Sequence, residues 1–216
     1  MPLLLKITVD LLLLSIFTVG HTVLLRSDWR MRISKLVPSP MFFTIYGLHS
    51  AISLIMIFIF WQKLPGNIWL LSGYLKTAVE ILMVISWLYM GYALFSTGAM
   101  KHIGVAQWIN HIRGKVTKYE LIHGGAYHHC RHPIFLAFFG MIWFTPNMTT
   151  GHLLVTIYWS VYLYLGTLWK EEQLYRNASY REYAEKVPPY PFFPKKMMKE
   201  IITFKKSNFE NFGVSK

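Results

Sequence analysis

The chain has 216 residues, of which 54% are hydrophobic and 15% are charged, and its formal net charge is +12. Soluble domains carry about a quarter of charged residues, so this composition excludes an ordinary soluble protein. A strongly basic chain could bind nucleic acid, but the placement of the basic residues favours membrane lipids as partners and no nucleic acid.

Five apolar segments follow one another along the chain. A membrane-spanning helix needs about 20 mostly apolar residues. The segments cover residues 3–25, 42–61, 75–95, 134–144 and 153–169, and the fourth is short for a span. Pro146 and Gly151 indicate a turn between the last two, which therefore read as a helical hairpin. The sequence thus predicts an all-α integral membrane protein with about five transmembrane helices and a C-terminal hairpin.

The basic residues are concentrated on one side of these predicted spans. Of the 22 Lys and Arg residues, 19 follow the first span, the third span or the fifth span. With five spans these three regions face the same side, and the positive-inside rule places that side in the cytoplasm. We expect a cytoplasmic C-terminus, with residues 1–194 forming a single membrane domain and residues 195–216 forming a basic cytoplasmic tail.

A few ionisable residues lie within or near the first three spans. His21 and His49 belong to the first two, and Glu80 belongs to the third. An ionisable group in the membrane costs about 2.5–3.5 kcal/mol or more, so each is a candidate functional group. The alternatives are a neutral interfacial histidine at position 21 and an ion pair between Glu80 and Lys76, which precedes it by four residues.

The motif GAYHHCRHPIF, at 125–135, places polar residues directly before the fourth apolar segment. Proline suits the first helical position and restricts the residue before it, so we expect the helix to begin at Pro133. Free N–H groups at that helix start, with Arg131 beside them, are suited to a carboxylate or phosphate. The alternative is that Arg131 and the histidines only anchor the span. The His and Cys residues lack the spacing of a zinc site, so no metal is expected.

A carboxylate pair, Glu171 and Glu172, ends the fifth span. The hairpin would return this pair to the membrane level of Arg131, so a cationic helix start would face an anionic helix end. That polarity suits a zwitterionic ligand with a further positive centre, such as S-adenosylmethionine. The alternative is an ion pair that only joins the two ends of the hairpin.

Together these motifs resemble those of membrane methyltransferases related to isoprenylcysteine carboxyl methyltransferase. The family pattern is Gly-x-Tyr, Arg-His-Pro, a Glu pair and a Tyr-rich segment ending in Val-Pro; this chain has GAYHHCRHPIF, EE and YREYAEKVPPYPFFP. The segment RHPIFLAFFGMIWFTPNMTTGHLL is most similar to the methanethiol S-methyltransferase and nurim-like branch. The similarity covers most of residues 20–194.

The resemblance implies a cytoplasmic pocket for S-adenosyl-L-methionine. The cofactor-binding residues that it implies are Tyr127, Arg131, His132 and Pro133, with Glu171 or Glu172, and, largely through backbone, the preceding Tyr119, Leu121 and Ile122.

The implied activity is S-adenosylmethionine-dependent methyl transfer in a bacterial cell membrane. Such a displacement needs mainly alignment of the reacting groups. A thiol acceptor must also lose its proton, and His132 and Arg131 are the catalytic candidates for assisting that step. We expect a small or lipophilic thiol such as methanethiol as the substrate. An isoprenylcysteine-type carboxyl methyltransferase and a non-catalytic nurim-like membrane protein are the alternatives.

Overall fold

The computed structural model describes residues 1–25, 29, 32–33, 35–37, 39–98, 105–115 and 123–192. The described chain is mostly helical. It divides into two compact units, the first formed by residues 1–71, 97–120 and 147–158 and the second by residues 72–96, 121–146 and 159–216. The predicted basic tail, residues 195–216, lies outside the described residues.

Each of the five apolar segments forms one helix. The helices are α1 (Leu3–Leu25), α3 (Ser39–Phe60), α4 (Gly73–Ser96), α7 (Pro133–Trp143) and α8 (Thr150–Leu174). Helices α1, α3 and α4 are long and apolar enough to cross a membrane. Helix α7 is apolar but has 11 residues. Three of the predicted spans therefore have the length and composition that a span requires.

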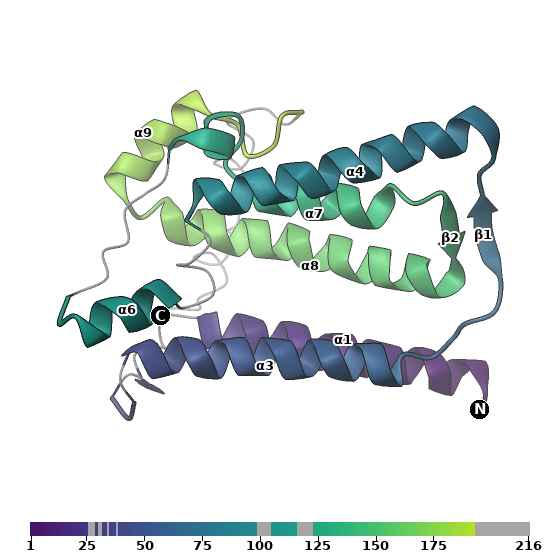
Figure 1. The fold of residues 1–216 in the computed structure, drawn as a ribbon, viewed down its shortest axis with the longest axis horizontal. Coiled ribbons are helices and arrows are strands. Elements are labelled where there is room, and N and C mark those ends of the chain that lie inside the picture. The colour runs from purple at the N-terminus through teal and green to yellow at the C-terminus, as the bar shows by residue number, and fades with distance from the viewer. Residues whose placement is uncertain are drawn as a thin grey trace, which may run out of the picture. The chain divides into compact units, whose positions relative to one another are not determined.

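In the first unit, α1 and α3 lie side by side (Figure 1). Gly20 allows this approach, because a Cβ atom there would lie 2.1 Å from Nε2 of His49. His21 of α1 reaches α3 as well, with its Nε2 atom 2.9 Å from the hydroxyl of Tyr46. The two histidines of the predicted spans thus lie at the contact between these helices.

A short helix, α6 (Val105–Ile112), packs against α3 in the same unit. The indole N–H of Trp108 donates a hydrogen bond to Oγ1 of Thr44, at 2.8 Å. The helix leaves Ile112 79% exposed. An exposed isoleucine next to a helix that is long and apolar enough to cross a membrane suits contact with lipid.

Two short strands add a small sheet to the all-α prediction. Strand β1 (Asn67–Leu70) pairs antiparallel with β2 (Asn147–Thr149), with Trp69 opposite Met148. The sequence indicated only a turn at Pro146 and Gly151, because runs of three or four residues are too short to show strand periodicity. The pairing supplies hydrogen-bond partners to backbone groups in the α3–α4 loop and in the α7–α8 loop.

In the second unit, α4 packs along α7 (Figure 1). The contact is close at Gly140, where a Cβ atom would lie 2.4 Å from Oγ of Ser86. At the end of α4, Oγ of Ser96 accepts a hydrogen bond from the backbone N–H of Ala126, at 3.1 Å. Ala126 belongs to a single 3-10 turn, η1 (Gly125–His128). Helix α4 therefore holds both α7 and the polar motif that precedes it.

The second unit also contains α9 (Ala178–Lys186), whose start is capped by Asn177. The side-chain oxygen of Asn177 accepts a hydrogen bond from the backbone N–H of Ser179, at 2.9 Å, as is typical of an N-cap. The buried residues of α9 are Tyr180, Tyr183 and Ala184. They lie on one face of the helix because Tyr183 and Ala184 follow Tyr180 by three and four residues.

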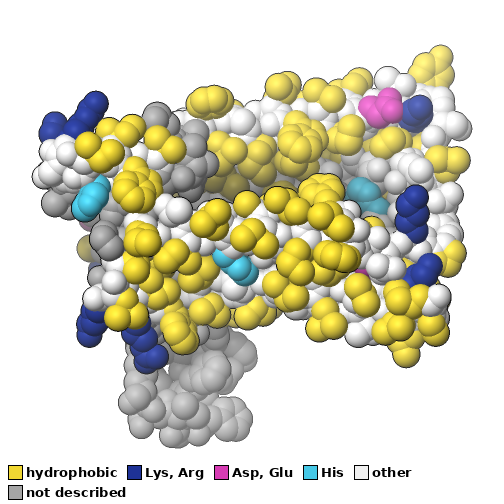
Figure 2. Space-filling view, turned by 60° about the horizontal axis from the view of Figure 1, so that its bottom comes forward, with side chains coloured by type: hydrophobic (Ala, Val, Ile, Leu, Met, Phe, Trp, Pro, Cys, Tyr) yellow, Lys and Arg dark blue, Asp and Glu magenta, His cyan; other side chains and the backbone are white. Residues whose placement is uncertain are grey.

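The surface of the long helices is largely apolar. Figure 2 shows hydrophobic side chains spread over the visible face, with Lys and Arg side chains gathered toward helix ends. In α4, Tyr74 is 97% exposed and Phe95 is 80% exposed. Near the start of α4, Lys76 lies 3.8 Å from Glu80, which confirms the predicted i, i+4 ion pair. Exposed apolar side chains along a helix suit contact with lipid.

Candidate functional site

The polar motif meets α7 as the sequence predicts. Helix α7 begins at Pro133, and His132 precedes it as the N-cap residue, with φ of −124°. No side chain caps this helix start. The backbone N–H of Arg131 donates a hydrogen bond to the carbonyl of Pro188, at 3.0 Å, so the segment after α9 is fixed against the motif.

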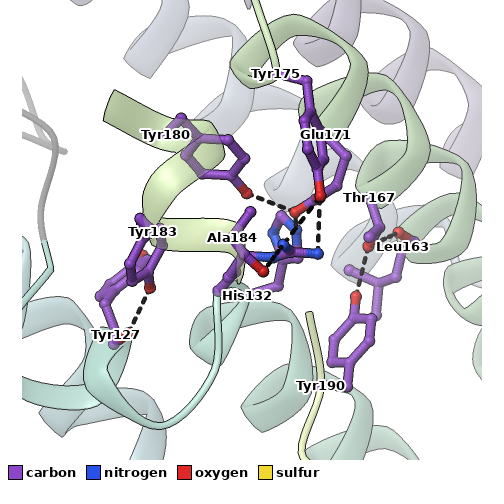
Figure 3. Close-up of polar contacts among 11 residues, drawn as sticks. Tyr127, His132, Leu163, Thr167, Glu171, Tyr175, Tyr180, Tyr183, Ala184 and Tyr190 are labelled. Carbon is purple, nitrogen blue, oxygen red and sulfur yellow. Dashed lines mark hydrogen bonds and ion pairs between the residues drawn. The ribbon is translucent and has the colours of Figure 1, made fainter. Parts of the chain in front are cut away.

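Glu171 is the centre of a buried polar cluster in the second unit (Figure 3). Its Oε1 atom accepts hydrogen bonds from Nε2 of His132 and from the hydroxyl of Tyr180, both at 2.5 Å. Its Oε2 atom lies 3.0 Å from Nη2 of Arg131, and the side chains of Arg131 and Glu171 are both 0% exposed. The Arg131–Glu171 ion pair that the sequence left as an alternative is therefore present. One carboxylate at the end of α8 thereby joins the start of α7 to α9.

Arg131 is held on several sides. Its Nη1 atom donates to the hydroxyl of Tyr175, at 3.2 Å, and to the carbonyl of Ala184, at 3.1 Å. Its guanidinium carbon lies 5.8 Å and 5.9 Å from the ring centroids of Tyr175 and Tyr180, within cation–π range. Its Nε atom is buried without a hydrogen-bond partner among the described residues. The contact to Glu171 is close, but its atoms are not aligned for a hydrogen bond.

The electrostatics of the cluster follow from burial and from these contacts. Burial lowers the pKa of His132, and this effect outweighs the neighbouring carboxylate. Burial raises the pKa of Glu171, but the hydrogen bonds from His132 and Tyr180 and the charge of Arg131 leave that pKa below its usual value. We therefore assign a neutral imidazole and an ionised carboxylate.

This assignment fixes the tautomer of His132. A carboxylate only accepts hydrogen bonds, so Nε2 of His132 carries the proton that Glu171 binds. The other ring nitrogen, Nδ1, then has a free lone pair. Within the described part of the chain, no hydrogen bond to Nδ1 is present. A neutral imidazole that is oriented at one nitrogen and free at the other is suited to accept a proton.

The structure distinguishes the two members of the carboxylate pair. Glu171 binds Arg131 and His132, whereas the side chain of Glu172 is partly buried on another side of α8. Residues four positions apart share a helix face, but adjacent residues point about 100° apart, so only one member of the pair can face the cluster.

The other predicted site residues have separate positions. The carbonyl of Tyr127 accepts a hydrogen bond from Tyr183 of α9, and burial raises the pKa of the Tyr127 phenol to about 12. Pro133 is buried at the first position of α7. Three further predicted cofactor-binding residues, Tyr119, Leu121 and Ile122, lie outside the described residues.

Several residues of the cluster were not singled out from the sequence. They are Tyr175, Tyr180, Thr167 and Tyr190. A signal existed for α9, because Tyr180 and Tyr183 are spaced to share a helix face in YREYAEK. Nothing in the spacing of Thr167 and Tyr190 indicates that their hydroxyl groups meet at 2.5 Å.

The remaining histidines of the motif do not join a metal-binding group within the described ranges. His123, His128 and His129 are exposed, and Cys130 is buried. Among the residues that the structure describes, no three His, Cys, Asp or Glu side chains lie close enough together to hold a metal ion.

These features define a helical membrane protein with a buried Arg–His–Glu cluster where two helix ends meet. A family model described as "NnrU protein" matches residues 11–177, which is more than half of the chain. The chain belongs to this NnrU protein family.

Curated relatives agree with that family and confirm the resemblance drawn from the motifs. A methanethiol S-methyltransferase of Pseudomonas deceptionensis is 31% identical over 85% of this chain and 71% of its own length. Methanethiol S-methyltransferase 1 of Bradyrhizobium diazoefficiens is 29% identical over 84% of this chain and 65% of its own length. A methanethiol S-methyltransferase of Mycobacterium tuberculosis is 29% identical over 86% of this chain and 79% of its own length. No solved structure gives a significant match.

Proposed function

We propose that this protein is an integral-membrane, S-adenosylmethionine-dependent methyltransferase that S-methylates a small thiol such as methanethiol. The names of the relatives support the reaction and the acceptor. The observation within the chain that carries the proposal is the His132–Glu171 pair. It presents a neutral imidazole, oriented through Nε2 and free at Nδ1, to an acceptor that must lose a proton.

The cluster fits the charges of the proposed cofactor. Nε of Arg131 is a buried donor without a hydrogen-bond partner in the described part of the chain, and α7 has no side-chain cap. Both features favour a carboxylate near the helix start, and the cofactor carries one. When bound, S-adenosylmethionine supplies an activated methyl group on a sulfonium. We propose that Arg131, His132, Tyr127 and Pro133 line its site and that Glu171 acts through Arg131 and His132.

In this proposal His132 is the catalytic base. A thiol with a pKa of about 8.5 is only a few per cent ionised at neutral pH, so a base that accepts the proton while the carbon–sulfur bond forms assists the attack. The proton moves from the acceptor sulfur to Nδ1 of His132. Bound S-adenosylmethionine would supply the methyl group for the new carbon–sulfur bond, and its sulfur would leave with the electron pair of the broken bond. Glu171 stabilises the resulting imidazolium through Nε2.

Arg131 has a positioning role in the same scheme. Its contacts to Tyr175, Ala184 and Glu171 hold it in place, and its charge adds to the hydrogen bonds from His132 and Tyr180 in keeping Glu171 ionised. An ionised Glu171 in turn requires the proton of His132 on Nε2, which leaves Nδ1 free. The sequence proposed Arg131 and His132 as a catalytic pair; the geometry favours His132 for the proton and Arg131 for its orientation.

The membrane arrangement is part of the proposal. We propose α7 and α8 as the fourth and fifth spans, forming a hairpin in one membrane domain of residues 1–194. The contact between them supports this, because Trp143 donates to Ser160 at 3.0 Å and Phe138 packs edge-on against Trp159. The placement of the basic residues supports a cytoplasmic cofactor site, tail and C-terminus, and the bacterial relatives support a bacterial cell membrane.

The test uses purified protein in lipid nanodiscs with methyl-labelled S-adenosylmethionine and methanethiol. We expect labelled dimethyl sulfide, measured by gas chromatography. His132→Gln should lower kcat/KM for methanethiol by about 10²–10⁴-fold, a loss well beyond any loss of cofactor affinity that calorimetry measures.

Other outcomes of this test separate the alternatives. Label found only in a base-labile methyl ester of a prenylcysteine analogue would favour a carboxyl methyltransferase. Folded protein that transfers the methyl group to neither acceptor would favour a non-catalytic membrane protein. A His132→Gln variant with unchanged kcat/KM would remove His132 as the base but leave the activity intact.

A further inference from the structure

Tyr190 lies beside the imidazole of His132 although no step of the proposed reaction uses it. Its ring centroid is 5.8 Å from that of His132, with the two planes tilted by 43°. Phe135 also flanks this imidazole, stacked at 5.8 Å with an angle of 22°. An acceptor that hydrogen-bonds to the imidazole must therefore fit beside two aromatic rings.

The hydroxyl of Tyr190 is held by Thr167 of α8 (Figure 3). Thr167 donates its own hydroxyl proton to the carbonyl of Leu163, at 2.9 Å. Its Oγ1 atom, 2.5 Å from the phenol oxygen, must then accept the proton of Tyr190. The phenol proton is thus committed to Thr167, so Tyr190 contacts the imidazole through ring packing rather than by donating to it.

The backbone before Tyr190 is also fixed. The carbonyl of Pro188 accepts the hydrogen bond from the backbone N–H of Arg131, which is the residue next to His132. Pro189 is fully buried, and prolines restrict the chain on both sides of Tyr190. The fixed backbone restrains the ring beside the imidazole independently of the hydroxyl contact with Thr167.

We infer that Tyr190 is a specificity-determining residue that limits the acceptor to short-chain thiols. This inference rests on the proposed thiol methyltransferase function, and it names the substrate class of the same site: apolar thiols with one or two carbons. The rigid ring occupies the volume that a longer alkyl chain would need. A substitution that removes the ring of Tyr190 should admit longer thiols. A substitution that removes only its hydroxyl should leave the ring, and the limit on chain length, in place.

The experiment compares kcat/KM for butanethiol and for methanethiol, with the full chain in nanodiscs. We expect Tyr190→Ala to raise the butanethiol-to-methanethiol ratio by about tenfold or more, because one or more methylenes are excluded at a close-fitting wall. Tyr190→Phe should keep the wild-type ratio. Tyr164→Ala is the matched control, since Tyr164 is a tyrosine of α8 that is 57% exposed.

An unchanged ratio in Tyr190→Ala, in protein that still binds S-adenosylmethionine by calorimetry, would overturn the inference. Tyr190→Leu keeps an apolar side chain of smaller size and provides the same comparison if the alanine variant does not fold. If the wild-type protein methylates methanethiol but Tyr190→Ala and Tyr190→Leu both keep the wild-type ratio, the role of Tyr190 is refuted while the proposed function stands. Wild-type protein that methylates no thiol would refute the proposed function, and this inference with it.

Discussion

Nε2 of His132 lies 2.5 Å from Oε1 of Glu171, and both side chains are buried. The two residues come from the start of α7 and the end of α8, 39 positions apart in the chain. This contact sets the tautomer of the histidine and helps to keep the glutamate ionised. The predictions below test what depends on it.

Glu171→Gln should destabilise the folded protein by about 3–5 kcal/mol, because it leaves the buried Arg131 without its counter-charge. The free energy of unfolding can be measured by denaturant titration in detergent micelles. Glu172→Gln is the matched control. Its side chain is only partly buried, so its cost should be clearly smaller. Equal costs for the two variants would contradict the central role of Glu171.

Tyr180→Phe should cost about 1.5–3 kcal/mol of unfolding free energy, because the phenol donates a hydrogen bond to the ionised Glu171. The ring packing of Tyr180 would be retained, so the cost reports on the hydroxyl. In a Glu171→Gln background the same change should cost less, since the acceptor is then neutral. A double-mutant cycle of the four proteins measures this coupling, and additive costs would argue against the hydrogen bond.

The stability should depend on pH through His132. Burial lowers the pKa of His132 in the folded protein, so protonation favours the unfolded chain. The stability that the neutral imidazole contributes is full above about pH 6.5, the usual value, and is lost as the pH falls toward the lowered pKa. We expect the unfolding free energy to fall by up to about 1.4 kcal/mol per pH unit in this window. His132→Gln should remove this part of the slope, and an unchanged slope would show that other groups cause it.

Gly140→Ala should destabilise the contact between α4 and α7 by about 1–3 kcal/mol, because its Cβ would lie 2.4 Å from Oγ of Ser86. Adding Ser86→Gly removes the clashing atoms and should recover much of that loss. Gly91→Ala is the control, since nothing lies within 4 Å of a Cβ there. Thermal unfolding in micelles measures all four proteins. A Ser86→Gly change that recovers nothing would mean that another contact limits position 140.

The predicted topology places Lys115 in the cytoplasm and Lys63 on the opposite side of the membrane. Both side chains are exposed, so single cysteines there should react with a thiol reagent. In a Cys130→Ala background, a membrane-impermeant maleimide added to intact cells should label Lys63→Cys and spare Lys115→Cys until the cells are opened. The reverse pattern would invert the orientation and place the proposed cofactor site outside the cytoplasm.

The sequence by itself determined the five apolar helices and where one of them begins. The length of the apolar segments predicted α1, α3, α4, α7 and α8. A helix in contact with lipid must be apolar along its length, and this property can be seen in the local sequence. Pro133 set the start of α7, because proline restricts its own backbone and that of His132. The charge spacing of Lys76 and Glu80 likewise predicted their ion pair, which depends only on helical geometry.

Only the tertiary structure decided which polar groups meet. The sequence treated Glu171 and Glu172 as equivalent, because nothing local says which face of α8 turns toward Arg131. The contacts of Tyr180 with Glu171, and of Tyr190 with Thr167, join residues whose approach depends on how α9 and the segment after it fold back. The strand pair β1 and β2 also depends on two distant connectors meeting. Helix formation follows from neighbours in the chain, whereas the cluster depends on the packing of helix ends, which no short stretch of sequence encodes.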